Sequence, residues 1–152
     1  MTAWSIEGCA KLARCAKGLV LHHHRTKELL LTTVARDLSA ARWTAWRAAL
    51  GAGDVSALDA LWDRLEREHR DRSGRALIEL RLAGFEGTLL GPADAAELAR
   101  LLARALDVTP DELPEPVVLE PLLEGYLLAL QRNASTEGVR EAFFRYWLSY
   151  VK

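Results

Sequence analysis

The chain has few of the features that staple or anchor a small domain. Its 152 residues include only two cysteines, so a disulfide scaffold is excluded. No apolar run reaches 18 residues, so no segment spans a membrane as a helix. The 20 basic and 21 acidic side chains leave a net charge of −1, which excludes a histone-like polycation. Four charged residues interrupt the first 20 positions, which is not typical of a signal peptide, and we expect a cytoplasmic protein.

Leucine and alanine are the commonest residues of the chain, with 28 and 24 copies respectively. Both are strong helix formers, β-branched residues are few, and no long stretch alternates apolar with polar side chains. We therefore expect an all-α protein: a single helical domain over residues 1–152, built as an irregular or orthogonal bundle of six to eight helices.

Apolar residues at helical spacing predict where these helices lie. Segment 75–90 also fits a short strand, but we favour a helix because a lone strand would have no partner. A helix after the proline-rich stretch is expected to start at Pro121. The predicted helical segments are 4–20, 26–50, 56–72, 75–90, 92–106, 109–113, 121–131 and 136–150.

Two of these helices carry sequence signals for their first turn. Ser56 followed by Asp59 has the shape of a capping box, and so does Thr109 followed by Glu112. Acid-then-base pairs four residues apart, including Glu68 with Arg72, indicate a solvated outer face on helix 56–72. The acidic residues between 107 and 120 are interpreted as a solvated connection.

Residues 98–113, LARLLARALDVTPDEL, resemble the closing segment of phage-repressor-type helix-turn-helix domains. The resemblance covers about 16 residues and implies a helix followed by a short capped helix. Segment 75–91 has no recognition-helix pattern, so the resemblance implies a way of packing two helices and no DNA-reading element.

The run His22-His23-His24 is the obvious candidate for metal binding, with Cys9 or Cys15 as further ligands. Their spacing matches no zinc pattern, and successive residues on a helix point about 100° apart. If 4–20 is one helix, the cysteines lie roughly 9 Å apart along its axis, too far for a mutual disulfide. We therefore predict no metal ligands and no cofactor, and keep a small metal protein or enzyme around His22–His24 as a second alternative.

No catalytic signature occurs. The chain lacks the nucleophile-elbow, phosphate-loop and zinc-protease motifs, and we predict that it is not an enzyme.

Charge is unevenly distributed along the chain. Residues 1–50 carry a net charge of +5, whereas each of the other two thirds carries −3. Within residues 1–50, basic and aromatic side chains interleave, a pattern that suits contact with nucleic acid or with an acidic partner. The alternative is that the tryptophans are core anchors and the arginines a solvated rim. The candidate contact residues are Arg25, Lys27, Arg36, Arg42, Trp43, Trp46 and Arg47.

The last helix is apolar on more than one side, which predicts either a deeply buried helix or one covered by another chain. The candidate interface residues are Phe144, Trp147, Leu148 and Val151. Taken together, the sequence favours a non-catalytic binding protein that acts through protein–protein contacts, as a regulator, adaptor or small subunit. A partner protein or self-association is expected. The alternative is a nucleic-acid-binding subunit that uses the basic first third.

Overall fold

The computed structural model describes residues 5–85, 90–132 and 135–151, and these ranges are all-helical, as predicted. They form eight α-helices and two short 3-10 turns, with no strand. In chain order these are α1 (Ile6–Leu12), α2 (Lys17–His23), α3 (Lys27–Ala49), η1 (Leu50–Ala52), α4 (Ser56–Arg70), α5 (Ser73–Leu82), α6 (Pro92–Leu106), η2 (Pro110–Glu112), α7 (Pro116–Gln131) and α8 (Thr136–Leu148).

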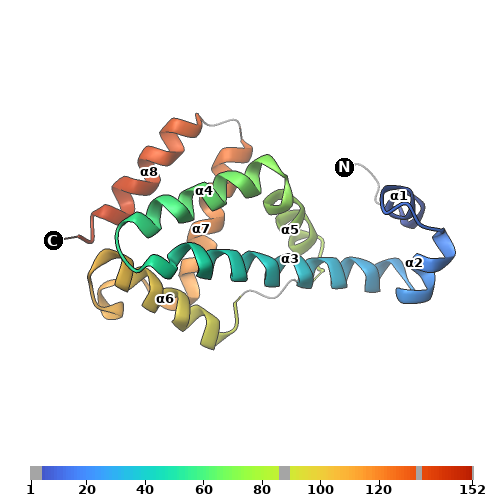
Figure 1. Ribbon diagram of the computed structural model, residues 1–152, viewed down its shortest axis with the longest axis horizontal. Helices are drawn as coiled ribbons and strands as arrows, with labels where there is room; N and C mark the ends of the chain where they lie inside the picture. The colour runs from blue at the N-terminus through green and yellow to red at the C-terminus, as the bar shows by residue number, and fades with distance from the viewer. Residues whose placement is uncertain (1–4, 86–89, 133–134, 152) are drawn as a thin grey trace.

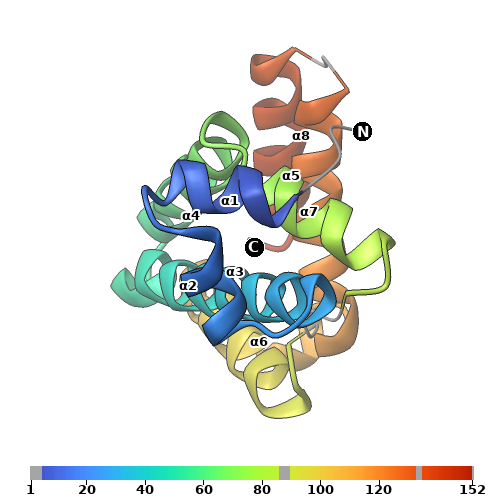
Figure 2. The ribbon, with the colours of Figure 1, turned by 90° about the vertical axis from the view of Figure 1, so that its right-hand side faces the viewer.

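The long helix α3 runs along most of the molecule (Figure 1). Helices α4, α6, α7 and α8 gather around its C-terminal half, whereas α1 and α2 lie near its N-terminal end (Figures 1 and 2). The main core joins α3, η1 and every helix from α4 to α8, and Trp46, Trp62 and Trp147 are its largest members. A smaller cluster, which includes Leu31 and Leu77, packs the first half of α3 against α5.

The predicted helix over 4–20 is wrong, because the chain turns between α1 and α2; position 4 itself lies outside the described residues. Arg14 adopts a left-handed conformation with φ of 52°, and the Cys15 amide donates to the carbonyl of Ala10 at 3.0 Å. This is the hydrogen-bond pattern that closes a helix C-terminus. In α1 only Ala10 is buried, and in α2 no residue is.

The two predicted caps have different outcomes. Thr109 and Glu112 form the capping box, although the element that follows is a 3-10 turn rather than an α-helix. The box at Ser56 is wrong: the carboxylate of Asp54 accepts hydrogen bonds from the Ser56 amide and hydroxyl. These bonds lower the pKa of Asp54.

Segment 75–90 is helical only up to Leu82, because α5 runs from Ser73 to Leu82 and residues 83–85 and 90 are not helical. Gly84 has φ of 82°, a conformation that favours glycine and stops the helix. Positions 86–89 of the predicted helix lie outside the described residues.

Helix α7 starts at Pro116, not at Pro121 as predicted. Pro116 occupies the first turn, where its missing N–H costs nothing. Pro121 lies inside the helix and lacks the N–H that would bond to the carbonyl of Val117, near the exposed helix start.

In the described part of the chain, no helix is long and apolar enough to span a membrane.

Candidate functional site

Four of the seven predicted nucleic-acid contact residues are buried or already have an acidic partner. Arg42 and Trp46 are buried, with 4% and 1% of their surfaces exposed. Neither can reach a phosphate or a base, so both are removed from that prediction. Helical geometry explains this, because the two side chains lie four residues apart on the side of α3 that packs against α4.

Arg42 belongs to a buried cluster of ion pairs. Its guanidinium donates to Glu68 of α4 at 2.9 Å and to Glu124 of α7 at 2.5 Å. Glu68 also accepts the indole N–H of Trp46 at 3.1 Å and an N–H of Arg64 at 3.2 Å. Glu68 is 1% exposed, so its predicted place on a solvated face with Arg72 is wrong.

The same cluster extends to α5 through Arg81. This guanidinium donates to Glu120 at 2.8 Å and to Glu124, the two acids of α7. Glu120 is 5% exposed and also accepts the amide of Leu90 at 2.6 Å, so it is not part of a solvated connection. Three arginines and three glutamates thus neutralise one another, and the cluster ties α3, α4, α5 and α7 together.

The other predicted contact residues do not form a single face. The half-buried Trp43 donates its indole N–H to Asp94 at 3.1 Å, and the exposed Arg47 lies 3.8 Å from Glu97, so α6 supplies acids beside both. The remaining three, Arg25, Lys27 and Arg36, are exposed.

Lys27 and Arg36 are nine residues apart on α3, about 180° around the helix, so they face opposite ways.

Two of the three histidines and both cysteines line one hollow of about 270 Å³ near α1 and α2. Its lining includes Cys9, Cys15, His23 and His24. The α1–α2 turn brings the two cysteines to it, which a single helix would not do. Among the described residues, no three His, Cys, Asp or Glu side chains are placed to hold a metal ion together.

On α8 the predicted interface is divided between core and surface. Trp147 is fully buried and contacts the ring of Phe143, with ring centroids 6.3 Å apart, so it is removed from the predicted interface. Leu148 and Val151 are exposed, and Phe144 is half-buried beneath the guanidinium of Arg140. These three residues stay a prediction.

The neighbouring helix, α7, turns its charged side chains into the protein and exposes uncharged ones, the opposite of a usual surface helix. Glu120 and Glu124 are its only charged residues, and both point into the buried cluster. The outward side has no charge over four turns. Its exposed residues are Pro116, Val117, Val118, Pro121, Gly125 and Leu128.

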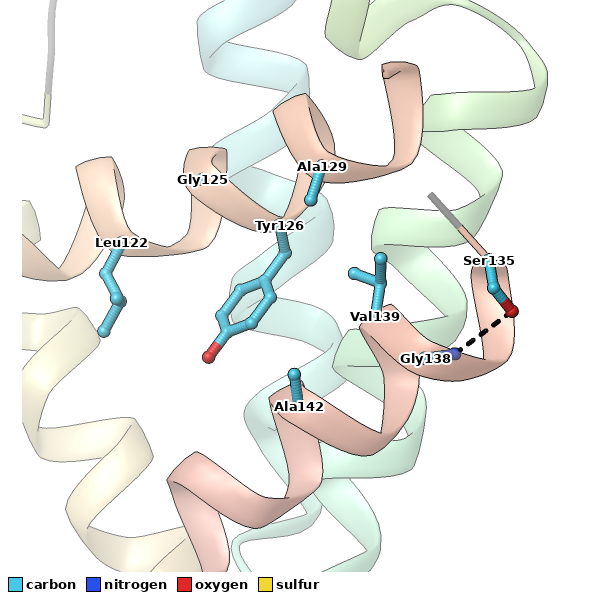
Figure 3. Close-up of a pocket in the computed structure, with 8 residues that line it drawn as sticks. All are labelled: Leu122, Gly125, Tyr126, Ala129, Ser135, Gly138, Val139 and Ala142. Atoms are coloured by element: carbon cyan, nitrogen blue, oxygen red, sulfur yellow. Dashed lines mark hydrogen bonds between the residues drawn. The ribbon is translucent and has the colours of Figure 1, made fainter. Parts of the chain in front are cut away.

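An apolar groove of about 490 Å³ separates α7 from α8 beside this stripe. Figure 3 shows Tyr126 pointing into the space between the helices, with Ala129 opposite Val139. Burial of the Tyr126 side chain raises the pKa of its phenol to about 12. Small residues line both sides of the groove: Gly125 and Ala129 on α7, and Gly138 and Ala142 on α8.

We call the exposed stripe and the groove together the α7 surface. Sequence reasoning missed it, because apolar residues all round a helix usually indicate deep burial. The available signal was that residues 116–131 contain only two charges, spaced four apart so that one side of the helix holds both.

Comparisons with known proteins give no relatives: no family model, no curated protein and no solved structure matches the chain.

The chemistry of the α7 surface is therefore the guide to function. An exposed uncharged stripe beside an apolar groove buries apolar area when another protein surface covers it. In the buried cluster, by contrast, each carboxylate is ion-paired to a guanidinium.

Proposed function

We propose that the chain is a non-catalytic helical protein that acts by binding another protein chain through the α7 surface. Its role is that of a regulator, an adaptor or a small subunit of an assembly. The observation that carries the proposal is the reversed polarity of α7. Val117 is 66% exposed, Val118 44% and Leu128 41%, while Glu120 and Glu124 are turned inward.

Burial energetics support this proposal. Covering apolar surface contributes about 25 cal/mol per Å² removed from water. Covering a charged surface would also cost the desolvation of each unpaired ion. Because no ionised group occurs on the exposed side of α7, that cost is absent along the stripe.

The groove supports a proteinaceous ligand. Small residues in its walls let the backbone of a helix approach closely, as in helix-in-groove recognition. A Cβ built on Gly125 would meet nothing within 4 Å, so the space beside α7 is open to an incoming side chain.

A photo-crosslinking amino acid at position 118 tests the proposal. In extracts of the cells that naturally express the chain, we expect a crosslink to one identified protein, either a different protein or a second copy of this chain. Leu128→Glu should weaken binding of that protein, once purified, by about tenfold or more. Val55, a valine that is 55% exposed at the start of α4, is the matched control position.

Equal crosslinking from positions 118 and 55, or binding unchanged by Leu128→Glu, would overturn the proposal.

A further inference from the structure

Four of the six exposed residues of α7 follow a coiled-coil spacing. Val118, Pro121, Gly125 and Leu128 are separated by three, four and three residues, the a and d positions of a heptad. Such a stripe is the contact line of one helix against another. Resting on the function proposed above, we propose that the partner is a second copy of this chain, with α7 packed antiparallel against α7 across a two-fold axis.

The stripe is complementary to itself in this arrangement. Antiparallel helices pair a positions with d positions, so the two-fold axis sets Val118 against Leu128 of the copy and Pro121 against Gly125 of the copy. The proline ring projects where the facing glycine has no side chain, and the space beside Gly125 is open. Because of the two-fold symmetry, Pro121 of each copy fits against Gly125 of the other copy.

The charges at the ends of α7 select the antiparallel orientation. Glu115, which precedes the helix, and Arg132, which follows it, are both exposed. Seventeen residues separate them, about 25 Å of helix. An antiparallel pair brings Glu115 of each copy towards Arg132 of the other, whereas a parallel pair would bring like charges together.

The size of the α7 surface predicts a weak dimer. Sixteen residues give a helix about 24 Å long, and two adjacent helices are about 20 Å wide. The resulting area of about 500 Å² is below the roughly 800 Å² per partner of a standard stable interface. We therefore expect a dimer that dissociates on dilution, not an obligate one.

Sedimentation velocity over a range of concentrations tests the dimer directly. We expect the full chain to convert from monomer to dimer as concentration rises. Leu128→Glu should weaken the dimer by about tenfold or more, and Val55→Glu, an exposed valine outside the α7 surface, should leave it unchanged. Helicity measured by circular dichroism identifies any variant that fails to fold. A chain that stays monomeric up to its solubility limit would overturn the proposal.

Charge reversal at these two exposed residues, which flank α7, tests the orientation, and circular dichroism again checks the fold. Glu115→Arg and Arg132→Glu should each weaken the dimer several-fold, and the double variant should restore it. Weakening without restoration would overturn the antiparallel arrangement.

The two proposals fail separately. A monomeric chain whose position 118 still crosslinks to a different, identified protein would remove the second copy and leave the proposed function standing. A monomeric chain with no such crosslink would remove both.

Discussion

Arg42 joins α4 and α7 within the buried ion-pair cluster. Its guanidinium is 4% exposed and is shared between Glu68 and Glu124. Its Nη2 atom has no hydrogen-bond partner, although the side chain also lies 5.4 Å from the centroid of the Trp46 ring.

Replacing Arg42 tests the buried cluster. Arg42→Met leaves Glu68 and Glu124 buried with one cation fewer, and we expect a loss of about 3 kcal/mol in the free energy of unfolding. Urea denaturation measures it. The control is Arg47→Met, whose side chain is 52% exposed and lies 3.8 Å from Glu97; its effect should stay within about 0.5 kcal/mol. Equal losses in both variants would contradict the structural role of the cluster.

The tyrosines give a pH dependence. Burial raises the pKa values of Tyr126 and Tyr146 from 10.0 to about 12. A raised pKa in the folded state contributes stability that is complete below the unfolded pKa of about 10 and is lost as the pH rises through 12. We expect the free energy of unfolding to fall between pH 10 and 12. The phenolate absorbance of these two residues should appear at a higher pH than that of an exposed tyrosine.

Tyr126→Phe checks this assignment. The ring and its contact with Phe143, at 5.2 Å between centroids, remain, but the ionisable hydroxyl is gone. The fall in stability above pH 10 should become shallower. An unchanged slope would mean that Tyr126 does not contribute to it.

Among the elements, α7 is the one whose parts have opposed roles. Its inner side carries the charges and its outer side carries none, so it is both a structural helix and the proposed docking element. Gly125 lies exposed in its middle, where the absence of a side chain weakens the helix and opens the groove.

Alanine substitution separates these effects. Gly125→Ala should raise the free energy of unfolding of the monomer by about 0.5–1 kcal/mol, because its Cβ meets open space and alanine favours the helix. Urea denaturation at low protein concentration measures this. The control is Gly74→Ala, whose Cβ would lie 3.3 Å from a methyl group of Leu127 and 3.4 Å from Glu68. It should be neutral or destabilising, and a gain equal to that of Gly125→Ala would contradict the open groove.

How far the elements could be predicted depended on the range of the deciding interaction. The capping box at Thr109 is local and was predicted. The α1–α2 break depends on Arg14 in a left-handed conformation, which no sequence signal marks because non-glycine residues rarely adopt it. The cap on Ser56 was misassigned because Asp54 and Ser56 both carry a suitable oxygen, and only the backbone conformation decides between them.

At the scale of the whole molecule, the basic side chains of residues 1–50 do not lie on one common surface. Arg42 is neutralised inside, Arg47 lies beside Glu97, and Lys27 and Arg36 face opposite sides of α3. A nucleic-acid surface needs cations along one face together with accessible bases or phosphates.

Fluorescence anisotropy with single- and double-stranded DNA and RNA measures the consequence. We expect only weak binding at low salt that disappears as the salt concentration rises, because few exposed cations release few counterions. Arg36→Glu should reduce it, whereas Trp43→Phe should leave it unchanged, since the indole is bound to Asp94. Tight binding that Trp43→Phe abolishes would instead support the nucleic-acid alternative.

The sequence by itself determined the all-α class and most of the helix positions, because periodicity and helix propensity act over a few residues. It also contained the sparse charge of residues 116–131. Tertiary structure alone decided which side of α7 is buried. Glu68, Glu120 and Glu124 look like surface residues by type, but Arg42 and Arg81 arrive from distant parts of the chain to pair with them. Once those acids are turned inward, apolar side chains of α7 remain on the outside, and that exchange created the α7 surface.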